Sequence, residues 1–205
     1  VKGGGATAHF EWTTSNDIGK LAQMQAQYKD LPDETGGIVD DLIVYKWSDT
    51  EYNCVVNASN IEKDWNWFVK QNEEQGFGAE LENISDRVSL LAVQGPNATK
   101  LVQKLTDVKL DEIEFYHFAG GAVAGIDDVI ISNTGYTGSG GFELYVWNDD
   151  AEKLWNAVME AGEEFGILPC GLGCRDTLRL EKGYCLYGND INDETSPIEA
   201  GLGWI

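Results

Sequence analysis

Basic side chains are scarce in this sequence. Fourteen lysines and arginines stand against 35 aspartates and glutamates, which gives a formal net charge of -21. A charge of this size repels the phosphate backbone of nucleic acids and anionic lipid surfaces through its long-range field. We therefore expect neither nucleic acid nor a membrane among the partners of this chain. A basic protein partner and a salty habitat would both agree with the acidity.

Long apolar runs are also missing. No run approaches the roughly 20 residues that a membrane helix requires. The first residues, Val1 to Gly5, lack the apolar core of a signal peptide. We expect a cytoplasmic protein. With 205 residues and 42% hydrophobic content, the chain suits one large or two small domains with a real core.

Metal-binding residue types are few. The four cysteines, which show no regular disulfide-scaffold spacing, are Cys54, Cys170, Cys174 and Cys185. Cys170 and Cys174 have a C-x3-C spacing that a metal site allows, but zinc needs four ligands and the only two histidines, His9 and His117, are distant in sequence. We expect reduced thiols and no metal. The common hydrolase, zinc-protease and P-loop motifs are absent.

The most informative segment runs from Gly36 to Tyr45, where two glycines precede an apolar β-branched run interrupted by two aspartates. The pattern predicts the second arm of a hairpin. Successive strand side chains point to opposite faces, so we expect one of Asp40 and Asp41 to face solvent and the other to face inward or into a cleft. A buried carboxylate either has a raised pKa or finds a donor, as a proton-handling site requires. The pair could equally mark a charged edge strand.

The neighbouring segments complete a predicted meander from about residue 25 to residue 58. Residues 25–28 are expected to pair with the Asp41 strand, which places Tyr28 near that carboxylate. Residues 52–58 form a third predicted strand with Asn57 at its end.

A helix is predicted from Ile61 to about residue 71, opened by the Ser-x-x-Glu capping pattern of residues 59–62. Helical spacing places Ile61, Trp65, Phe68 and Val69 against the sheet. The polar residues of this helix are expected to face water, and they are Glu62, Lys63, Asp64 and Lys70.

The second half of the chain again mixes strands and helices without strict alternation, which predicts an α+β fold. Predicted strands cover 79–84, 88–93, 115–118, 121–126, 129–131 and 142–147; predicted helices cover 98–105, 148–165 and 172–182, and a further one begins at Ser196. We expect two α+β units, residues 1–75 and 76–205.

A glycine-rich loop, residues 133–141, has four glycines in nine residues. It is either a mobile turn or a place where backbone approaches a flat ligand. Tyr136 lies inside the loop, and Glu143 follows it on a strand face shared with Tyr145 and Trp147. A carboxylate among aromatic rings suits a planar cationic or amino-bearing heterocycle.

Arg175 and Arg179 stand four residues apart and share one side of the predicted helix 172–182. They either bind an anionic group of a ligand or form internal ion pairs with Asp176 or Glu181. The sequence leaves both alternatives open.

Together these motifs resemble the T-protein family of the glycine cleavage system, the aminomethyltransferases. The similar segments follow one another in family order across nearly the whole chain. They are residues 25–28, 36–44, 55–58, 92–96, 135–138, 141–143, 171–181, 186–190 and 196–202.

The resemblance implies a folate-binding α+β fold with antiparallel or mixed sheets and flanking helices. The family moves a methylene group from the aminomethyl-dihydrolipoyl arm of the H-protein to tetrahydrofolate and releases ammonia. Its members carry several dozen residues before the position of Ala6 and a C-terminal β-barrel after the position of Ile205. We therefore expect this chain to lack that barrel and to be part of a longer protein.

The resemblance also assigns roles to individual residues. The family's catalytic aspartate, close to N10 of the folate, corresponds to Asp41, and its pterin-binding glutamate corresponds to Glu143. The other folate-contacting positions correspond to Arg175, Asn57, Tyr28 and Tyr136. Ser139 and Gly140 stand where the family loop usually has acidic residues.

Two other interpretations come from the same superfamily. One is a non-catalytic folate-binding module, as in iron-sulfur assembly factors; those carry Lys-x-Cys-x-x-Gly-Gln-Glu, and residues 182–190 lack its Gln-Glu ending. The other is the folate domain of an enzyme that oxidises sarcosine or dimethylglycine, although no dinucleotide-binding fingerprint occurs here.

Overall fold

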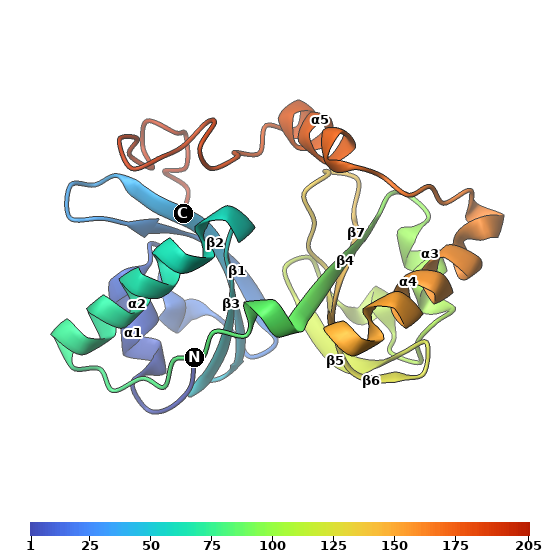
Figure 1. Cartoon of the computed structure of the whole chain (residues 1–205), viewed down its shortest axis with the longest axis horizontal. Coiled ribbons are helices and arrows are strands. Elements are labelled where there is room, and N and C mark those ends of the chain that lie inside the picture. Colours follow the sequence, from blue (N-terminus) through green and yellow to red (C-terminus); the bar gives the residue numbers. More distant parts are fainter. The chain divides into compact units, whose positions relative to one another are not determined.

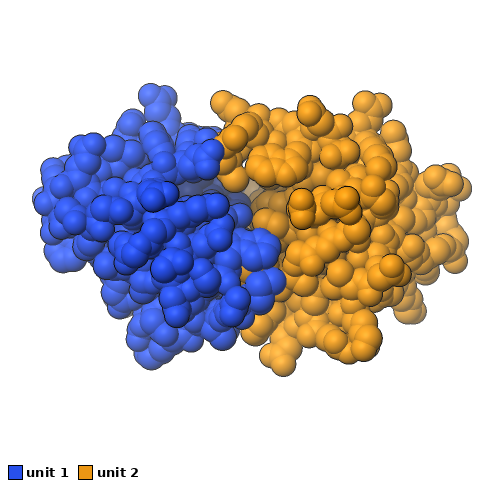
Figure 2. Space-filling model, turned by 90° about the horizontal axis from the view of Figure 1, so that it is seen from below, with its two compact units in different colours: residues 1–83, 185–205 blue, residues 84–184 orange.

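The computed structural model describes all residues, 1–205, and they form two compact units. Unit 1 contains Val1–Asn83 and Cys185–Ile205, and unit 2 contains Ile84–Tyr184, as coloured in Figure 2. The division predicted from sequence, 1–75 and 76–205, differs in giving the last segment to the second unit. That segment belongs to unit 1 because its Ile191 and Leu202 pack on Ile38. Local sequence patterns carry no information on such a distant contact.

Unit 1 is a three-stranded antiparallel sheet with two helices (Figure 1). Its elements are α1 (Ala6–Thr13), β1 (Gln25–Pro32), β2 (Ile38–Ser48), β3 (Glu51–Val55) and α2 (Ile61–Gln75), with short 3-10 turns at Ile18–Lys20 and Ala58–Asn60. The sheet order is β1-β2-β3, which confirms the predicted meander.

Both faces of this sheet are covered. On one face Phe10 of α1 and Phe68 of α2 pack with Leu42 and Val44 of β2. On the other face the ring of Tyr28 stacks on that of Trp204 in the C-terminal segment, with centroids 5.8 Å apart.

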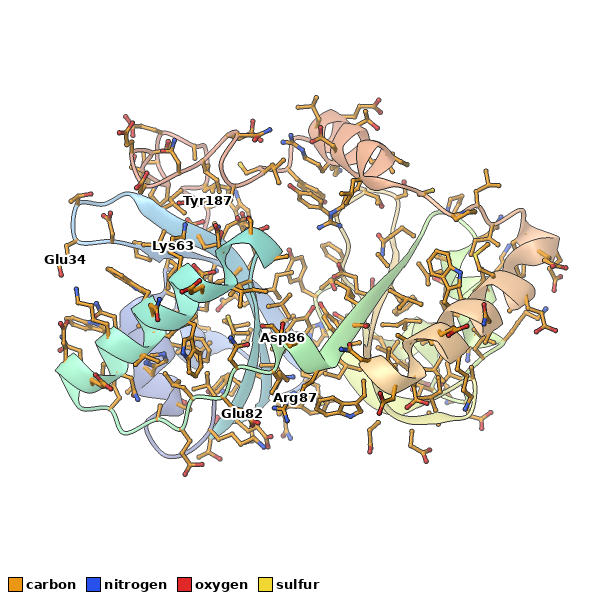
Figure 3. The ribbon with its side chains drawn as sticks, viewed as in Figure 1. Glu34, Lys63, Glu82, Asp86, Arg87 and Tyr187 are labelled. Atoms are coloured by element: carbon orange, nitrogen blue, oxygen red, sulfur yellow. The ribbon has the colours of Figure 1, made fainter.

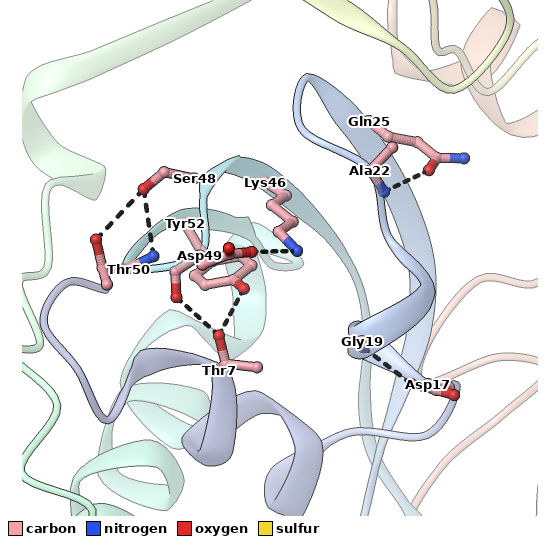
Figure 4. Close-up of polar contacts among 10 residues, drawn as sticks. All are labelled: Thr7, Asp17, Gly19, Ala22, Gln25, Lys46, Ser48, Asp49, Thr50 and Tyr52. Atoms are coloured by element: carbon pink, nitrogen blue, oxygen red, sulfur yellow. Dashed lines mark hydrogen bonds and ion pairs between the residues drawn. The ribbon is translucent and has the colours of Figure 1, made fainter.

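Polar contacts tie α1 to the turn between β2 and β3 (Figure 4). The Thr7 hydroxyl lies 2.8 Å from the Asp49 carbonyl oxygen, to which it donates, and 2.7 Å from the Tyr52 hydroxyl. The Lys46 ammonium forms an ion pair with Asp49 at 2.8 Å. These bonds fix the start of α1 against the sheet.

The expectation that one of Asp40 and Asp41 faces solvent is wrong. Asp40 is fully buried and Asp41 is half-buried. The two side chains do point to opposite faces of the sheet. Helices α1 and α2 cover one of these faces, and the C-terminal segment packs on part of the other.

Helix α2 also differs from its predicted orientation. Asp64, expected to face water, is fully buried together with Phe68, whereas Trp65 is only half-buried. The helix begins after Asn60 without a side-chain cap. Lys63 remains exposed, and its ammonium lies 4.0 Å from the centroid of the Tyr187 ring in the C-terminal segment (Figure 3).

Unit 2 is a four-stranded antiparallel sheet in the order β4-β7-β6-β5. Its elements are β4 (Val88–Gln94), α3 (Ala98–Gln103), β5 (Phe118–Val123), β6 (Ile126–Ser132), β7 (Gly141–Trp147), α4 (Asn148–Gly162) and α5 (Leu172–Lys182), with 3-10 turns at Ser85–Arg87, Leu110–Glu112 and Glu163–Phe165. Leu101 of α3 and Leu154 of α4 pack on Phe142 and Leu144 of β7. One face of the sheet is therefore the hydrophobic core of the unit.

Three further local predictions fail. Residues 79–84 form no strand beyond a single bridge from Lys2 to Glu80. The strand predicted over 121–126 is divided by a turn in which Ala124 and Gly125 have positive φ. Ser196 and Glu199 exchange the expected capping bonds, but a turn and not a helix follows.

No helix of the structure combines the length and the apolar character needed to cross a membrane.

We expect Gly37→Ala to destabilise unit 1. A Cβ at Gly37 would lie 1.8 Å from the carbonyl oxygen of Asp193, and the next residue, Ile38, donates its N–H to Asn192 at 3.1 Å. The substitution must push the C-terminal segment away, at a cost of about 1 to 3 kcal/mol. Gly4→Ala, which meets nothing within 4 Å, is the matched control. Urea unfolding measures both; equal stability of the two variants would contradict the close packing.

Candidate functional site

In unit 1 the structure brings together three residues that the sequence singled out. The Tyr28 hydroxyl donates to Oδ2 of Asp41 at 2.8 Å, and Nδ2 of Asn57 donates to Oδ1 at 2.8 Å. Each carboxylate oxygen therefore has its own donor. Asp41 keeps partial exposure.

Strand pairing explains this geometry. Tyr28 lies opposite Ile43 and Asp30 lies opposite Asp41, so Tyr28 and Asp41 are diagonal neighbours on one face of the sheet. At the other side of β2, Val55 of β3 lies opposite Ile43. Asn57 follows the end of β3 and so reaches Asp41.

Burial raises the pKa of Asp41, and the hydrogen bonds from Tyr28 and Asn57 oppose that rise. The pKa of Tyr28 is raised by burial and by the neighbouring Asp41 charge, so its hydroxyl stays a donor. A carboxylate with a raised pKa that is held by neutral donors is a stronger base than one in water. Asp41 is thus suited to accept a proton.

Sequence reasoning missed a second carboxyl group beside Asp41. Asp30, its cross-strand partner, is fully buried, and neither of its carboxyl oxygens has a donor. Burial, with a contribution from Asp41, raises the pKa of Asp30 to about 7. The predicted strand stopped at residue 28, which left Asp30 out of the register.

Sequence reasoning also left Asp40 without a role. Its Oδ2 accepts the Asn57 backbone N–H at 3.0 Å, and its Oδ1 accepts Nδ2 of Asn57 at 2.9 Å and Nδ2 of Asn60 at 2.6 Å. Asn57 therefore connects Asp40 on one face of β2 with Asp41 on the other. Asn60 is the N-cap residue of α2, but its side chain binds the Asp40 carboxylate and does not cap the helix.

In unit 2 Glu143 lies on the sheet face opposite the helices. It is 6% exposed and accepts the hydroxyl hydrogen of Thr134, whose oxygen lies 2.8 Å from that of Ser132. Burial raises the pKa of Glu143, while the Thr134 bond and the charge of Arg175 lower it. As predicted, Tyr145 shares this face and is nearly buried.

The glycine-rich loop is fastened to β4 by Gln94. Its Nε2 donates to the carbonyl oxygens of Thr134 at 3.1 Å and Phe142 at 3.2 Å. A Cβ at Gly135 would lie 2.0 Å from Oε1 of Gln94, so this close approach requires glycine. A pocket of about 210 Å³ opens here, lined by Gln94, Phe115, Asn133, Thr134, Gly135, Gly138, Gly140, Gly141, Lys182 and Tyr184.

An aromatic stack adjoins this loop. The rings of Tyr136 and Tyr184 stack with centroids 5.8 Å apart and planes 15° apart. The guanidinium of Arg175 lies 4.5 Å from the centroid of the Tyr136 ring. The structure thus brings Arg175, Tyr136 and, through its charge, Glu143 into one electrostatic group.

The two arginines of α5 have different roles. Arg179 is 3% exposed, and its Nε and Nη2 bind Oδ1 of Asp176 at 2.8 and 2.7 Å. Its Nη1 donates to the Tyr184 carbonyl at 3.2 Å. Arg175 is exposed. Arg179 therefore forms the internal ion pair, whereas the charge of Arg175 is exposed.

No group of three or more histidine, cysteine, aspartate or glutamate side chains is arranged to hold a metal ion. Each unit has its own polar set. Unit 1 holds Asp41, Tyr28 and Asn57, and unit 2 holds Glu143, Tyr136 and Arg175.

We expect Arg179→Ala to lower the free energy of unfolding by about 2 to 3 kcal/mol, because it leaves Asp176 and the Tyr184 carbonyl without their donor. Arg175→Ala, at an exposed position of the same helix, should change stability by no more than about 0.5 kcal/mol. Urea unfolding of the two variants measures the difference. Equal losses would contradict the division of roles.

The family model described as the GCVT N-terminal domain matches residues 1–205. Proteins named aminomethyltransferase from Bacteroides thetaiotaomicron and Flavobacterium psychrophilum are 61% and 58% identical over 205 residues. These matches cover 100% of this chain and 56% of each relative, so the chain spans about half the length of the curated relatives it matches.

Two solved structures are similar to this chain. The glycine cleavage system aminomethyltransferase T from Bartonella henselae superposes with a TM-score of 0.84 and 32% identity, over 99% of this chain and 53% of that one. The heterotetrameric sarcosine oxidase from Corynebacterium superposes with a TM-score of 0.56 and 15% identity, over 82% of this chain and 78% of that one, which shows a shared fold alone. Since the family model spans the whole chain and relatives above 55% identity match all of it, this chain belongs to the GCVT N-terminal domain family.

Proposed function

We propose that this chain is the folate-binding, proton-handling part of an aminomethyltransferase of the glycine cleavage system. The reaction passes a methylene group from an aminomethyl-dihydrolipoyl carrier to tetrahydrofolate and releases ammonia. The observation that carries the proposal is the Asp41 carboxylate, half-buried and held by Tyr28 and Asn57. Family membership supplies the reaction in which such a group is needed.

Glu143 recognises the pterin in this proposal. Its buried carboxylate suits the paired N–H donors of a pterin amino group and ring nitrogen. Each charge-assisted bond contributes about 1.5 to 3 kcal/mol and discriminates against ligands that lack those donors. Thr134 holds the carboxylate in place from one side.

Asp41 acts on the reacting amine of the folate. Its charge first stabilises the positive charge that develops as ammonia departs, and the carboxylate then accepts the proton that the amine loses as it attacks. Tyr28 and Asn57 keep both carboxylate oxygens oriented for this work. Neither neighbour competes for the proton, because both are neutral donors.

The remaining residues bind the rest of the folate. Tyr136 offers a ring face for stacking, and Arg175 offers an exposed positive charge to a carboxylate of the ligand. Asn57 and Tyr28 contribute polar contacts as well as orientation. We also propose a lipoylated H-protein as the partner and the cytoplasm as the location.

No observation favours the two alternatives over this function. The likeness to sarcosine oxidase is one of fold. A folate module without transfer chemistry has no evident need for a proton acceptor oriented as Asp41 is.

The pterin assignment is tested by titration calorimetry with 5-formyltetrahydrofolate. Glu143→Ala removes two charge-assisted bonds and should weaken binding by about 100-fold or more. Glu160→Ala, at an exposed glutamate of α4, is the control and should bind as the unchanged chain does. The same variants are made at the matching positions of the full-length Bacteroides thetaiotaomicron relative. Undiminished binding by the Glu143 variants would overturn the assignment.

The role of Asp41 is tested by turnover. Asp41→Asn keeps the shape and removes the base, so kcat should fall by about 100-fold or more while folate affinity changes little. The assay uses the full-length relative with the matching substitution, and calorimetry uses this chain. Unchanged kcat in the variant would refute the proton-acceptor role.

A further inference from the structure

Strand β1 carries a buried carboxyl group that no proposed step uses. Asp30 is 0% exposed, and neither of its carboxyl oxygens has a hydrogen-bond partner. Taking an ionised carboxylate out of water without a donor costs far more than burying a protonated one. The burial of Asp30 therefore favours its protonated, neutral form.

The strand register places this group beside the proposed proton acceptor. Asp30 lies directly opposite Asp41 in the antiparallel pairing of β1 with β2. Side chains of directly opposite residues project from the same face of a sheet. Tyr28, two residues before Asp30, projects from this face too and donates to Asp41. Because no hydrogen bond joins the two carboxyl groups, they act on each other through charge.

The backbone of Asp30 shows how close the pair is. Its N–H donates to Oγ of Ser15 at 2.8 Å, and its carbonyl accepts the Ser15 N–H at 2.9 Å. Both groups therefore point away from β2, which makes Asp30 and Asp41 a non-hydrogen-bonded pair. In such pairs the Cα atoms are about 4.5 Å apart and the side chains approach most closely. Ser15 thus holds Asp30 in place beside Asp41.

The two carboxyl groups differ in their ability to carry a charge. Asp41 is half-buried and has one donor on each oxygen, from Tyr28 and Asn57. Asp30 has none. Like charges that directly face each other repel, so the second ionisation of the pair is harder than the first. Asp41 therefore ionises first, and Asp30 keeps its proton.

The titratable groups around Asp30 agree with this order. Burial first, and then the charge of Asp41, raises the pKa of Asp30 to about 7. Tyr28 stays neutral on the same face and packs with Cys185 of the C-terminal segment. The ammonium of Lys29 donates to two backbone carbonyls, and strand alternation places this side chain on the other face.

We propose that Asp30 is a positioning residue that acts through Asp41: it stays protonated while Asp41 is the charged member of the pair, and its ionisation makes Asp41 hold a proton more tightly. Asp30 is fully buried and touches no substrate. No proton passes between the two groups, because no hydrogen bond joins them. The order of ionisation stands on the geometry of unit 1, whereas its effect on turnover rests on the proposed function of Asp41.

Carboxyl-carbon NMR titration of this chain tests the pair without folate. In the unchanged chain Asp30 should titrate at about pH 7. Asp41→Asn keeps the shape of the side chain and removes its charge, so the titration midpoint of Asp30 should fall by about one pH unit. Glu34→Gln, at an exposed position between β1 and β2, is the control and should leave the midpoint unchanged. A midpoint that does not respond to Asp41→Asn would overturn the pairing.

Urea unfolding tests the retained proton independently. Between about pH 4 and pH 7 folded Asp30 holds a proton that the unfolded chain has released, so the stability that this proton contributes falls as pH rises through this window. Asp30→Asn has no such proton. The unfolding constant of the unchanged chain should therefore rise with pH about tenfold per unit more steeply than that of the variant. Parallel profiles would overturn the assignment of the proton to Asp30.

The effect on Asp41 is tested by turnover. The assay uses the full-length Bacteroides thetaiotaomicron relative with aspartate at the positions that match Asp30 and Asp41. Asp41 is the stronger base when Asp30 is ionised, so the ratio of kcat at pH 8 to kcat at pH 6 should be about threefold higher than in the matching Asp30→Asn variant. A side chain that only fills space would not change this ratio. Equal ratios would therefore overturn the positioning role.

These readouts separate the two proposals. The expected shift of the Asp30 midpoint, combined with no turnover by the unchanged relative, would refute the proposed function and leave the carboxyl pair standing. Normal turnover, combined with an Asp30 midpoint that Asp41→Asn does not move, would refute the role of Asp30 and leave the proposed function standing.

Discussion

The antiparallel pairing of β1 with β2 is the constraint on which unit 1 depends. Its register puts Asp30 opposite Asp41 and Tyr28 diagonal to it, while Asp40 points toward α2. A slip of one residue would exchange the faces of Asp40 and Asp41. The Tyr28 bond to Asp41 on one face and the Asn60 bond to Asp40 on the other each require the observed register, so the two faces of the sheet specify it together.

In unit 2 strand register likewise positions a carboxyl group, that of Glu143. The pairing of β6 with β7 sets Ser132 opposite Glu143, and Thr134, two residues further on, closes over the carboxylate. The side-chain amide of Gln94 holds the loop in place by donating to the backbone carbonyl of Thr134. Because Phe142 and Leu144 pack in the core on either side of Glu143 in sequence, the carboxylate stands on a strand that the core anchors.

Buried carboxyl groups are numerous for a chain that already carries a net charge of -21. Asp30, Asp40, Asp64 and Glu143 are all less than a tenth exposed. Neutral donors bind the carboxyl groups of Asp40 and Glu143, and burial raises the pKa of Asp30 and of Asp64. Such buried carboxyl groups cost stability when they are ionised and lack a donor.

The sequence by itself determined most of the local elements and the residue types of the candidate site. The meander, β7 and α5 follow from short-range patterns, and the family resemblance predicted Asp41, Glu143 and Arg175 as site residues. Tertiary structure decided burial and partnership, since these depend on contacts between distant residues. It buried Asp64, which helical spacing had placed in water, and it returned residues 185–205 to unit 1. It also assigned Arg179 to an ion pair and Arg175 to the surface, because only packing distinguishes two arginines on one side of a helix.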